Sequence, residues 1–260
     1  MKKVIVYLLL LLLLLFLITG GKAVAESLYK DITLADMLEE KYGITILTSS
    51  ECLDIPTPDT FTIGKKYYSP FLSMLAVNQS MQELEIIEKA LECYPDGFFK
   101  YFQDSRCPKG LRILLADEII ESDSSQHYQG YAYYAGSYYN LWLESGNFDP
   151  LTVHHELWHS LENVILNVYP NAFSLWDQVN PKGFQYLDDF TADRSGFDPD
   201  YFVRAYGIIT PQEDRATLIE AAFYDNRDEW FAKKPYILRK LLYLNAIIHV
   251  VMDYQYEINY

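Results

Sequence analysis

The sequence predicts an α+β domain in which a small mixed or antiparallel sheet precedes one long helix and a mostly helical C-terminal half. Three β-rich runs, at 112–120, 130–135 and 138–143, lie close together in the middle of the chain. A helix start follows at once, because Asp149 can cap a helix whose first residue is Pro150. Beyond that point apolar residues recur at helical spacing, with loops between them. This order of elements is typical of the α+β class.

The first 25 residues have the three parts of a secretory signal peptide. Lys2 and Lys3 precede an apolar run over 4–18, and Ala23-Val24-Ala25 supplies a small-x-small cleavage site. The run is shorter than the roughly 20 residues that a membrane-spanning helix needs. We therefore expect a secreted, extracellular or cell-envelope protein with no stable membrane insertion after cleavage; an uncleaved N-terminal anchor is the alternative.

The net charge and the cysteines limit the partners and the redox state. Lys and Arg number 21 against 36 Asp and Glu, which gives a formal net charge of −15. A charge this negative argues against nucleic acid as a partner. In an oxidising compartment, Cys93 and Cys107 could form a disulfide that closes a short loop, which would leave Cys52 without a disulfide partner. Three reduced thiols are the equal alternative.

The N-terminal part, 26–110, predicts a helix-and-strand portion. A helix is expected over 33–42 because its apolar residues have helical spacing, and Gly43 ends it. Residues 44–48 alternate as a short strand. Prolines and turn residues over 50–70 predict a surface loop. A second amphipathic helix is expected over 80–93. No repeat or long linker divides the chain, so 26–260 is expected to be a single domain.

The long helix carries the motif that indicates chemistry, His155-Glu156-x-x-His159. Residues four apart lie on one face of a helix, so the two imidazoles can bind one metal ion. Imidazole suits zinc, which lowers the pKa of its water towards about 7, and Glu156 would lie beside the ion to accept a proton. His154 points elsewhere on the helix and receives no metal role.

Short matches of this kind also occur by chance, on helices that simply carry surface histidines. Here three of the five histidines lie between 154 and 159, on an amphipathic helix that follows the strands. These features favour one zinc ion per chain. The remaining histidines, His127 and His249, are isolated and are expected to be structural or surface residues.

A third protein ligand is needed, and no third histidine follows closely enough to supply it. The downstream acidic candidates are Asp188, Asp189, Asp193, Glu213, Asp214 and Glu220. A helix starting at Thr210-Pro211 and running to Phe223 would carry the last three. Glu213 could instead complete a capping box with Thr210. In that case Asp214, Glu220 or Asp193 would have to bind the metal.

At this point the residues resemble a family. His155-Glu156-x-x-His159, Tyr206-Gly207 and Glu213-Asp214-Arg215-Ala216 are similar to the HExxH…E pattern of the gluzincin clan. The closer likeness is to the catalytic domain of anthrax lethal factor and to the exported bacterial proteins named putative zinc-binding metallopeptidases. The segment 176–186 also resembles theirs, and the likeness covers roughly residues 110–225. It implies a zincin-like fold with Glu213 as the third ligand and Tyr206 as the group that stabilises the oxyanion.

The resemblance implies a secreted zinc-dependent endopeptidase whose catalytic portion is 111–260. Zinc would polarise water and the scissile carbonyl, and Glu156 would act as general base. An extended peptide or protein substrate would pair with a strand edge, for which 138–143 is the expected strand. Glu162, Asp189 and Asp193 are candidates for bonding the histidine N–H groups. Two alternatives are a zinc amidase that acts on cell-wall peptides and a non-catalytic cell-envelope binding protein with a structural or vestigial zinc site.

Overall fold

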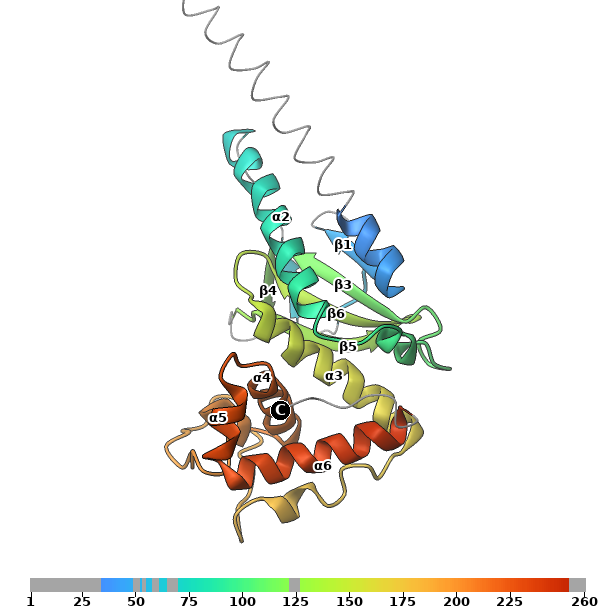
Figure 1. The fold of residues 1–260 in the computed structure, drawn as a ribbon. Helices are drawn as coiled ribbons and strands as arrows, with labels where there is room; N and C mark the ends of the chain where they lie inside the picture. Colours follow the sequence, from blue (N-terminus) through green and yellow to red (C-terminus); the bar gives the residue numbers. More distant parts are fainter. Residues whose placement is uncertain are drawn as a thin grey trace, which may run out of the picture.

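The fold is α+β, as the sequence predicts, with a small mixed sheet followed by helices (Figure 1). The computed structural model describes residues 34–48, 52, 55–57, 61–64, 70–121 and 127–252. The expected signal peptide and the polar segment 122–126 lie outside the described residues. Residues 34–42 are helical, and Gly43, at φ 66°, ends that helix in the left-handed region that glycine adopts without strain.

The main sheet has four strands in the order β1-β3-β6-β5. Their bounds are Thr45–Thr48 for β1, Leu111–Ala116 for β3, Gly130–Ala135 for β5 and Tyr138–Glu144 for β6. The first three strands in this order run parallel, and β5 pairs antiparallel with β6. The strand β6 is therefore interior to the sheet, and β5 forms one edge.

Two expectations about the strands were wrong. A strand, β2 (Phe61–Gly64), lies inside the expected loop over 50–70 and pairs antiparallel with β4 (Glu118–Glu121). The β-rich run 112–120 is two strands, because the chain bends at Asp117 and continues into this second sheet. Local composition does not reveal either feature, since pairing with a distant strand decides both.

The second helix also begins earlier than expected. Helix α2 spans Pro70–Leu91, ten residues before the predicted start at Ser80. Proline is favoured in the first turn of a helix because its missing N–H would be unpaired there in any case. Cys52 and Cys107 are buried and Cys93 is exposed, and none of the three is joined in a disulfide.

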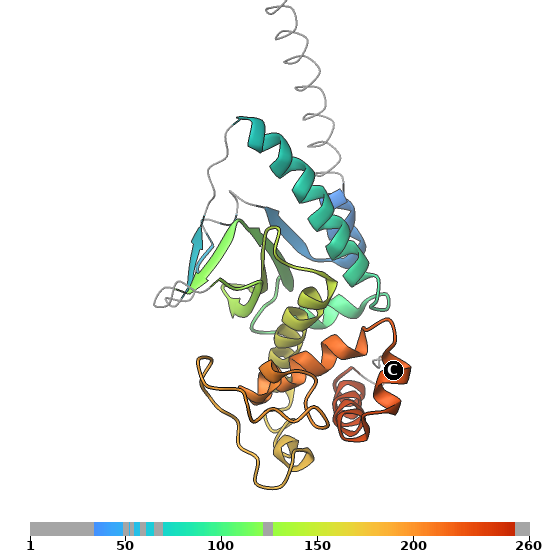
Figure 2. The ribbon, with the colours of Figure 1, turned by 90° about the vertical axis from the view of Figure 1, so that its left-hand side faces the viewer.

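Alternate residues of the sheet face two different cores. Leu111, Ile113 and Leu115 pack in the large cluster with side chains of α2 and α3. Leu114 and Trp142 face the opposite side, with Ile119 of β4. This alternation follows from the two-residue period of a strand. Figure 2 shows α2 on one side of the main sheet and the β2–β4 pair on the other.

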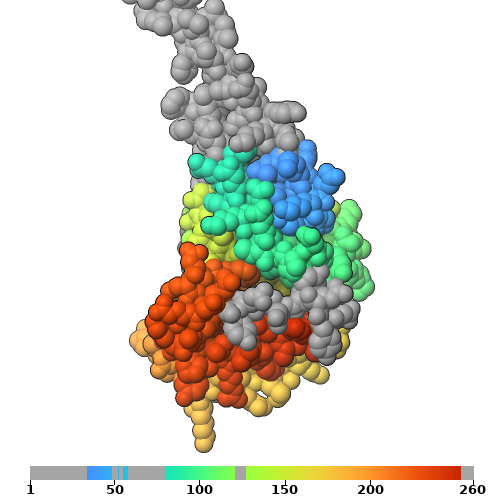
Figure 3. All heavy atoms as spheres, in the orientation of Figure 1, coloured from blue at the N-terminus to red at the C-terminus, as the bar shows by residue number. Residues whose placement is uncertain are grey.

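Helix α3 (Pro150–Val168) links the sheet to the C-terminal helices. Beyond it lie α4 (Pro211–Ala222), α5 (Arg227–Ala232) and α6 (Pro235–Val251). The large core extends from the sheet through α3 into α4 and α6. In Figure 3 the N-terminal and C-terminal parts are stacked one above the other. Within the described ranges, no helix has the length and apolarity that a membrane span requires.

Candidate metal centre

The predicted start of α3 is confirmed by its hydrogen bonds. The Asp149 carboxylate accepts a bond from the backbone N–H of Thr152 at 2.9 Å, and Pro150 follows the cap. Eleven residues of this helix are buried, among them His155 and Glu156. The cap fixes where the helix begins, and so fixes which residues face α4. His155 and His159 lie one turn apart, with their Nε2 atoms 3.1 Å from each other.

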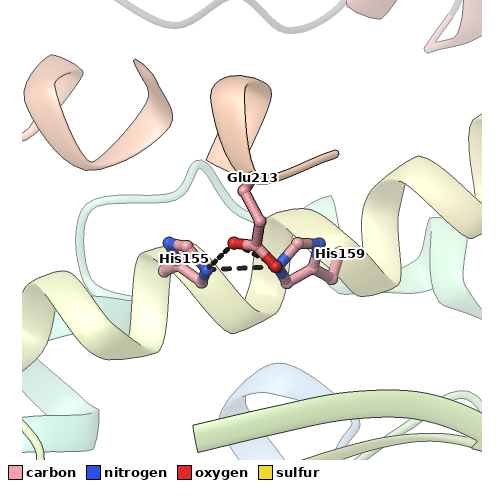
Figure 4. A group of neighbouring side chains, drawn as sticks. All are labelled: His155, His159 and Glu213. Atoms are coloured by element: carbon pink, nitrogen blue, oxygen red, sulfur yellow. Dashed lines mark hydrogen bonds and ion pairs between the residues drawn. The ribbon is translucent and has the colours of Figure 1, made fainter. Parts of the chain in front are cut away.

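The structure brings Glu213 to these two histidines. Its Oε2 atom lies 3.0 Å from His155 Nε2 and 3.6 Å from His159 Nε2. One ligand atom from each residue lies within 4.8 Å of the others. Figure 4 shows the imidazoles projecting from α3 towards the carboxylate, which descends from the start of α4. Residues distant in the sequence therefore form one compact cluster.

The three residues fit a zinc ion. Two imidazoles and one carboxylate are a common protein ligand set for catalytic zinc, with a fourth position left open. Ligand atoms about 2 Å from a tetrahedral ion are roughly 3.3 Å apart, close to the separations observed here. Glu213 Oε2 is buried and accepts no hydrogen bond of regular geometry from the described residues. A cation would satisfy this buried oxygen.

Glu220 lies behind His155 and orients it. Its Oε1 atom is 2.5 Å from His155 Nδ1 and also accepts a bond from Arg204 Nη2 at 2.5 Å. When Nδ1 donates to Glu220, Nε2 is left to face Glu213. Burial opposes protonation of His155, but its close contacts with the carboxylates of Glu213 and Glu220 outweigh this effect and raise the pKa of His155 to about 10. The surrounding carboxylates thus favour positive charge at this point.

Glu156 is buried beside the ligand cluster, with 6% of the residue exposed. Burial raises the pKa of its carboxyl group above the ordinary value, although His155 and His159 act in the opposite direction. A carboxylate with a raised pKa accepts a proton more readily than an exposed one. The side chain packs against Gly130, the first residue of β5.

Tyr206 lies at the edge of the cluster, its ring centroid 6.1 Å from that of His155. The guanidinium groups of Arg194 and Arg204 lie 5.4 and 5.2 Å from the centre of the Tyr206 ring. Burial raises the pKa of the Tyr206 hydroxyl, and the charge of Glu213 adds to the effect. The phenol therefore stays protonated and can donate a hydrogen bond.

Of the two hydrogen bonds that a capping box between Thr210 and Glu213 would have, the described residues show one. Thr210 Oγ1 accepts a bond from the backbone N–H of Glu213 at 3.2 Å. The Glu213 carboxylate lies against the histidines instead of returning to Thr210. Because the threonine satisfies the backbone donor, the glutamate side chain is left for the cluster.

The other ligand candidates have different partners. Asp214 is bonded to Lys240, Trp176 and Tyr186, and Glu220 is bonded to His155 and Arg204. Asp188 is exposed, and Asp189 and Asp193 are exposed with bonds to Thr191 and Ser195. Glu162 is buried, but it pairs with Arg215 and Trp158, not with a ligand histidine.

His154 and His127 have partners outside the cluster. His154 is stacked on Phe223, with ring centroids 3.6 Å apart, and its Nδ1 atom lies 2.9 Å from the Tyr94 hydroxyl. His127 Nδ1 lies 2.7 Å from the buried carboxylate of Glu144.

Sequence reasoning missed two contributors to the site. The sequence offers Glu220 as a candidate ligand, whereas in the structure it bonds Nδ1 of His155. Its place seven residues after Glu213, two turns along α4, is the signal that indicates this position. The sequence analysis places Gly130 only in a strand. The pattern Gly130-Tyr131-Ala132-Tyr133 puts small side chains on one face of β5, and this alternation is visible in the sequence.

Comparison with known proteins gives one solved structure. The crystal structure of a "putative zinc-binding metallo-peptidase" from Bacteroides caccae is similar, with a TM-score of 0.48 and 15% sequence identity over 85% of this chain and 86% of that one. No family model matches the sequence, and no curated protein matches it.

Proposed function

We propose that this chain is an exported zinc-dependent endopeptidase that hydrolyses peptide bonds. The single observation that carries the proposal is the convergence of His155 and His159 on Glu213, with the buried carboxylate of Glu156 beside them. Two histidines one turn apart, an adjacent glutamate and a carboxylate from a second helix are the parts that metal-assisted hydrolysis requires. The N-terminal sequence is the basis for proposing export.

Each residue of the site then has a distinct role. When bound, zinc would supply Lewis-acid chemistry, polarising a carbonyl group and lowering the pKa of water. Glu156 would take the proton from the attacking water and pass it to the leaving amine. Tyr206 would donate a hydrogen bond to the developing oxyanion. Glu220 would hold the ring of His155 in place.

The substrate would bind as an extended strand along β5. The sequence-based choice of 138–143 for this role is wrong, because β6 lies between β3 and β5. The backbone N–H of Glu144 donates to the carbonyl of Gln129, so Gly130, opposite Leu143, occupies a position that is not hydrogen-bonded to β6. By alternation, the N–H and C=O groups of Gly130 and Ala132 face the outer edge. An extended peptide could pair with them.

Metal content and peptidase activity test the proposal together. The full chain is purified and its zinc measured, beside the variants His155→Ala, Glu213→Ala and Glu156→Gln. We expect about one zinc per chain in the wild type, loss in the first two variants, and retention in Glu156→Gln. Cleavage of an unfolded protein substrate should fall by about 10²–10⁴-fold in Glu156→Gln. Asp193→Asn is the matched control. Asp193 is exposed and accepts a hydrogen bond from Ser195, so this variant should change neither the zinc content nor the cleavage rate.

Three results would contradict the proposal. The first is the absence of zinc from the wild type after reconstitution. The second is zinc retained when Glu213 is replaced, which would remove that residue from the ligand set. The third is full cleavage activity in Glu156→Gln, which would exclude the glutamate as the base. A zinc-loaded wild type that cleaves no peptide would instead indicate a structural metal site.

A further inference from the structure

Gly130 contacts the side chain that the proposed reaction uses as its base. A Cβ atom at position 130 would lie 2.5 Å from Cγ of Glu156, 2.9 Å from its Oε1 and 3.0 Å from its Cδ. Nonbonded carbon atoms do not approach this closely without displacement, since their optimal separation is about 3.5–4.0 Å. The Glu156 side chain therefore occupies the volume that a β5 side chain would otherwise fill.

The backbone of β5 does not itself require glycine at this position. Gly130 is absent from the residues with positive φ, so an alanine could adopt its conformation. It is paired with Leu143 in the regular register of β5 and β6. Space, and not backbone conformation, is the reason for glycine here.

The neighbouring residues show that the first part of this face of β5 carries only small side chains. Gly130 and Ala132 lie opposite Leu143 and Leu141, whose side chains belong to the core that includes α3. Tyr131 is paired with Trp142, which faces the other core. Over the first four residues of β5, the large side chains thus point away from α3 and the small ones point towards it, whereas Tyr134, farther along the small-residue face, is paired with Tyr139. The helix can approach the edge strand closely only at the small residues.

Displacement of Glu156 would also be hard to absorb. The closest contact is at Cγ, in the middle of the side chain, and the residue is 6% exposed. The carboxylate cannot stay in place while Cγ moves away from a new methyl group. We infer that Gly130 is a positioning residue. Because it has no side chain, it leaves the space in which the Glu156 side chain lies, and this space, called here the Gly130 seat, keeps the Glu156 carboxylate beside the proposed metal ligands. The inference depends on the proposed function for the role of Glu156, but not for the contact itself.

A double-mutant cycle measured by thermal unfolding (the stability cycle) tests the Gly130 seat without any assay of activity. Gly130→Ala is compared with wild type, and Gly130→Ala/Glu156→Ala with Glu156→Ala, all as the full chain with chelator present. The alanine methyl group should lower Tm by about 5 °C where Glu156 is intact, the effect of overpacking in a chain of this size. The decrease should be less than half as large where Glu156 is truncated. A Gly130→Ala chain that fails to fold but folds again in the double variant gives the same answer.

Gly196→Ala is the matched control for adding a methyl group. No atom within 4 Å would meet a Cβ at position 196, and its φ is not positive. This variant should leave Tm and activity unchanged. An equal decrease of Tm for Gly130→Ala in both backgrounds would overturn the inference.

A kinetic measurement separates positioning from a merely structural effect. Gly130→Ala should keep about one zinc per chain, because the three atoms nearest to its methyl group all belong to Glu156 and none to a proposed ligand, and KM should change by less than roughly threefold. Its kcat should fall by about 100-fold, the effect of displacing a reacting group by about 1 Å. Full kcat in Gly130→Ala would overturn the inference. If the effects of Gly130→Ala and Glu156→Ala on Tm are coupled but the wild type has no peptidase activity, the Gly130 seat is supported and the proposed function is contradicted.

Discussion

Lys240 of α6 donates hydrogen bonds to both carboxylate oxygens of Asp214, at 3.0 and 2.7 Å. Both side chains are 1% exposed, and Asp214 directly follows Glu213 in α4. Trp176 and Tyr186 donate to the same carboxylate. The pair therefore fixes the first turn of α4, which carries Glu213, the proposed third metal ligand.

Lys240→Met should destabilise the fold strongly. It leaves the charge of Asp214 buried without its cation, which costs about 3–5 kcal/mol. Urea unfolding of the metal-free chain measures the change. The double variant Lys240→Met/Asp214→Asn should recover part of the loss, because no unpaired charge remains. A change below about 1 kcal/mol for the single variant would contradict this role.

Glu220→Gln should weaken zinc binding by about 10–100-fold while the three ligands remain. The amide is a weaker acceptor than the carboxylate for the His155 Nδ1–H group, so the imidazole is held less firmly and is less basic. Competition with a zinc-chelating dye measures the affinity. Glu229→Gln, which alters an exposed pair with Lys233, is the control and should have no effect. Equal affinities in the two variants would show that Glu220 does not support the site.

Tyr206→Phe should reduce kcat by about 100-fold and leave the zinc content unchanged, because only the oxyanion donor is removed. Steady-state kinetics and metal analysis of one preparation measure both quantities. Tyr201→Phe is the control, since Tyr201 stacks on Tyr236 and its hydroxyl has no part in the metal centre. Unchanged kcat would exclude Tyr206 as the donor.

Ala132→Pro should raise KM by about 3–10-fold with little loss of stability. The N–H of residue 132 faces the outer edge of β5, so a proline removes a bond to the substrate and keeps the bonds to β6. Ala132→Ser, which retains the N–H, should bind substrate normally. If KM is the same in both variants, the substrate does not pair with β5 at this residue.

His154 should make the fold less stable in acid. Burial lowers the pKa of His154 to about 3, against about 6.5 in an unfolded chain. Between these values the unfolded chain binds a proton that the folded chain does not, so the free energy of unfolding falls as the pH falls, by about 1.4 kcal/mol per pH unit. His154→Phe keeps the stacking on Phe223 but does not titrate. Unfolding at pH 7 and pH 5, with chelator present, should show about 2 kcal/mol less acid sensitivity in this variant.

The elements with local start and stop signals were predicted well. Asp149-Pro150 and Thr210-Pro211 begin the two helices that carry the proposed ligands, and both starts are confirmed. Gly43, which ends the first helix, is also a local signal that the structure confirms. A cap acts within one turn, so the sequence close to it is enough to predict it.

The features that depend on distant pairing were not predicted. Strand β2 lies among prolines and becomes a strand because β4 pairs with it. That β6 is interior follows from its two neighbours, β3 and β5, and its own apolar pattern does not show which strand is the edge. Likewise, Gly130 matters through Glu156, a contact between β5 and α3 that no local pattern contains.

The two histidines and Glu213 stand on either side of the long connection between α3 and α4, most of which has no regular secondary structure. Binding one ion to all three would close this connection into a loop, as a crosslink does. The unfolded chain cannot present the three ligands together, so the binding free energy adds to the free energy of folding. Zinc depletion would then shorten the lifetime of the protein as well as remove the proposed activity, because the opened connection becomes accessible to proteases.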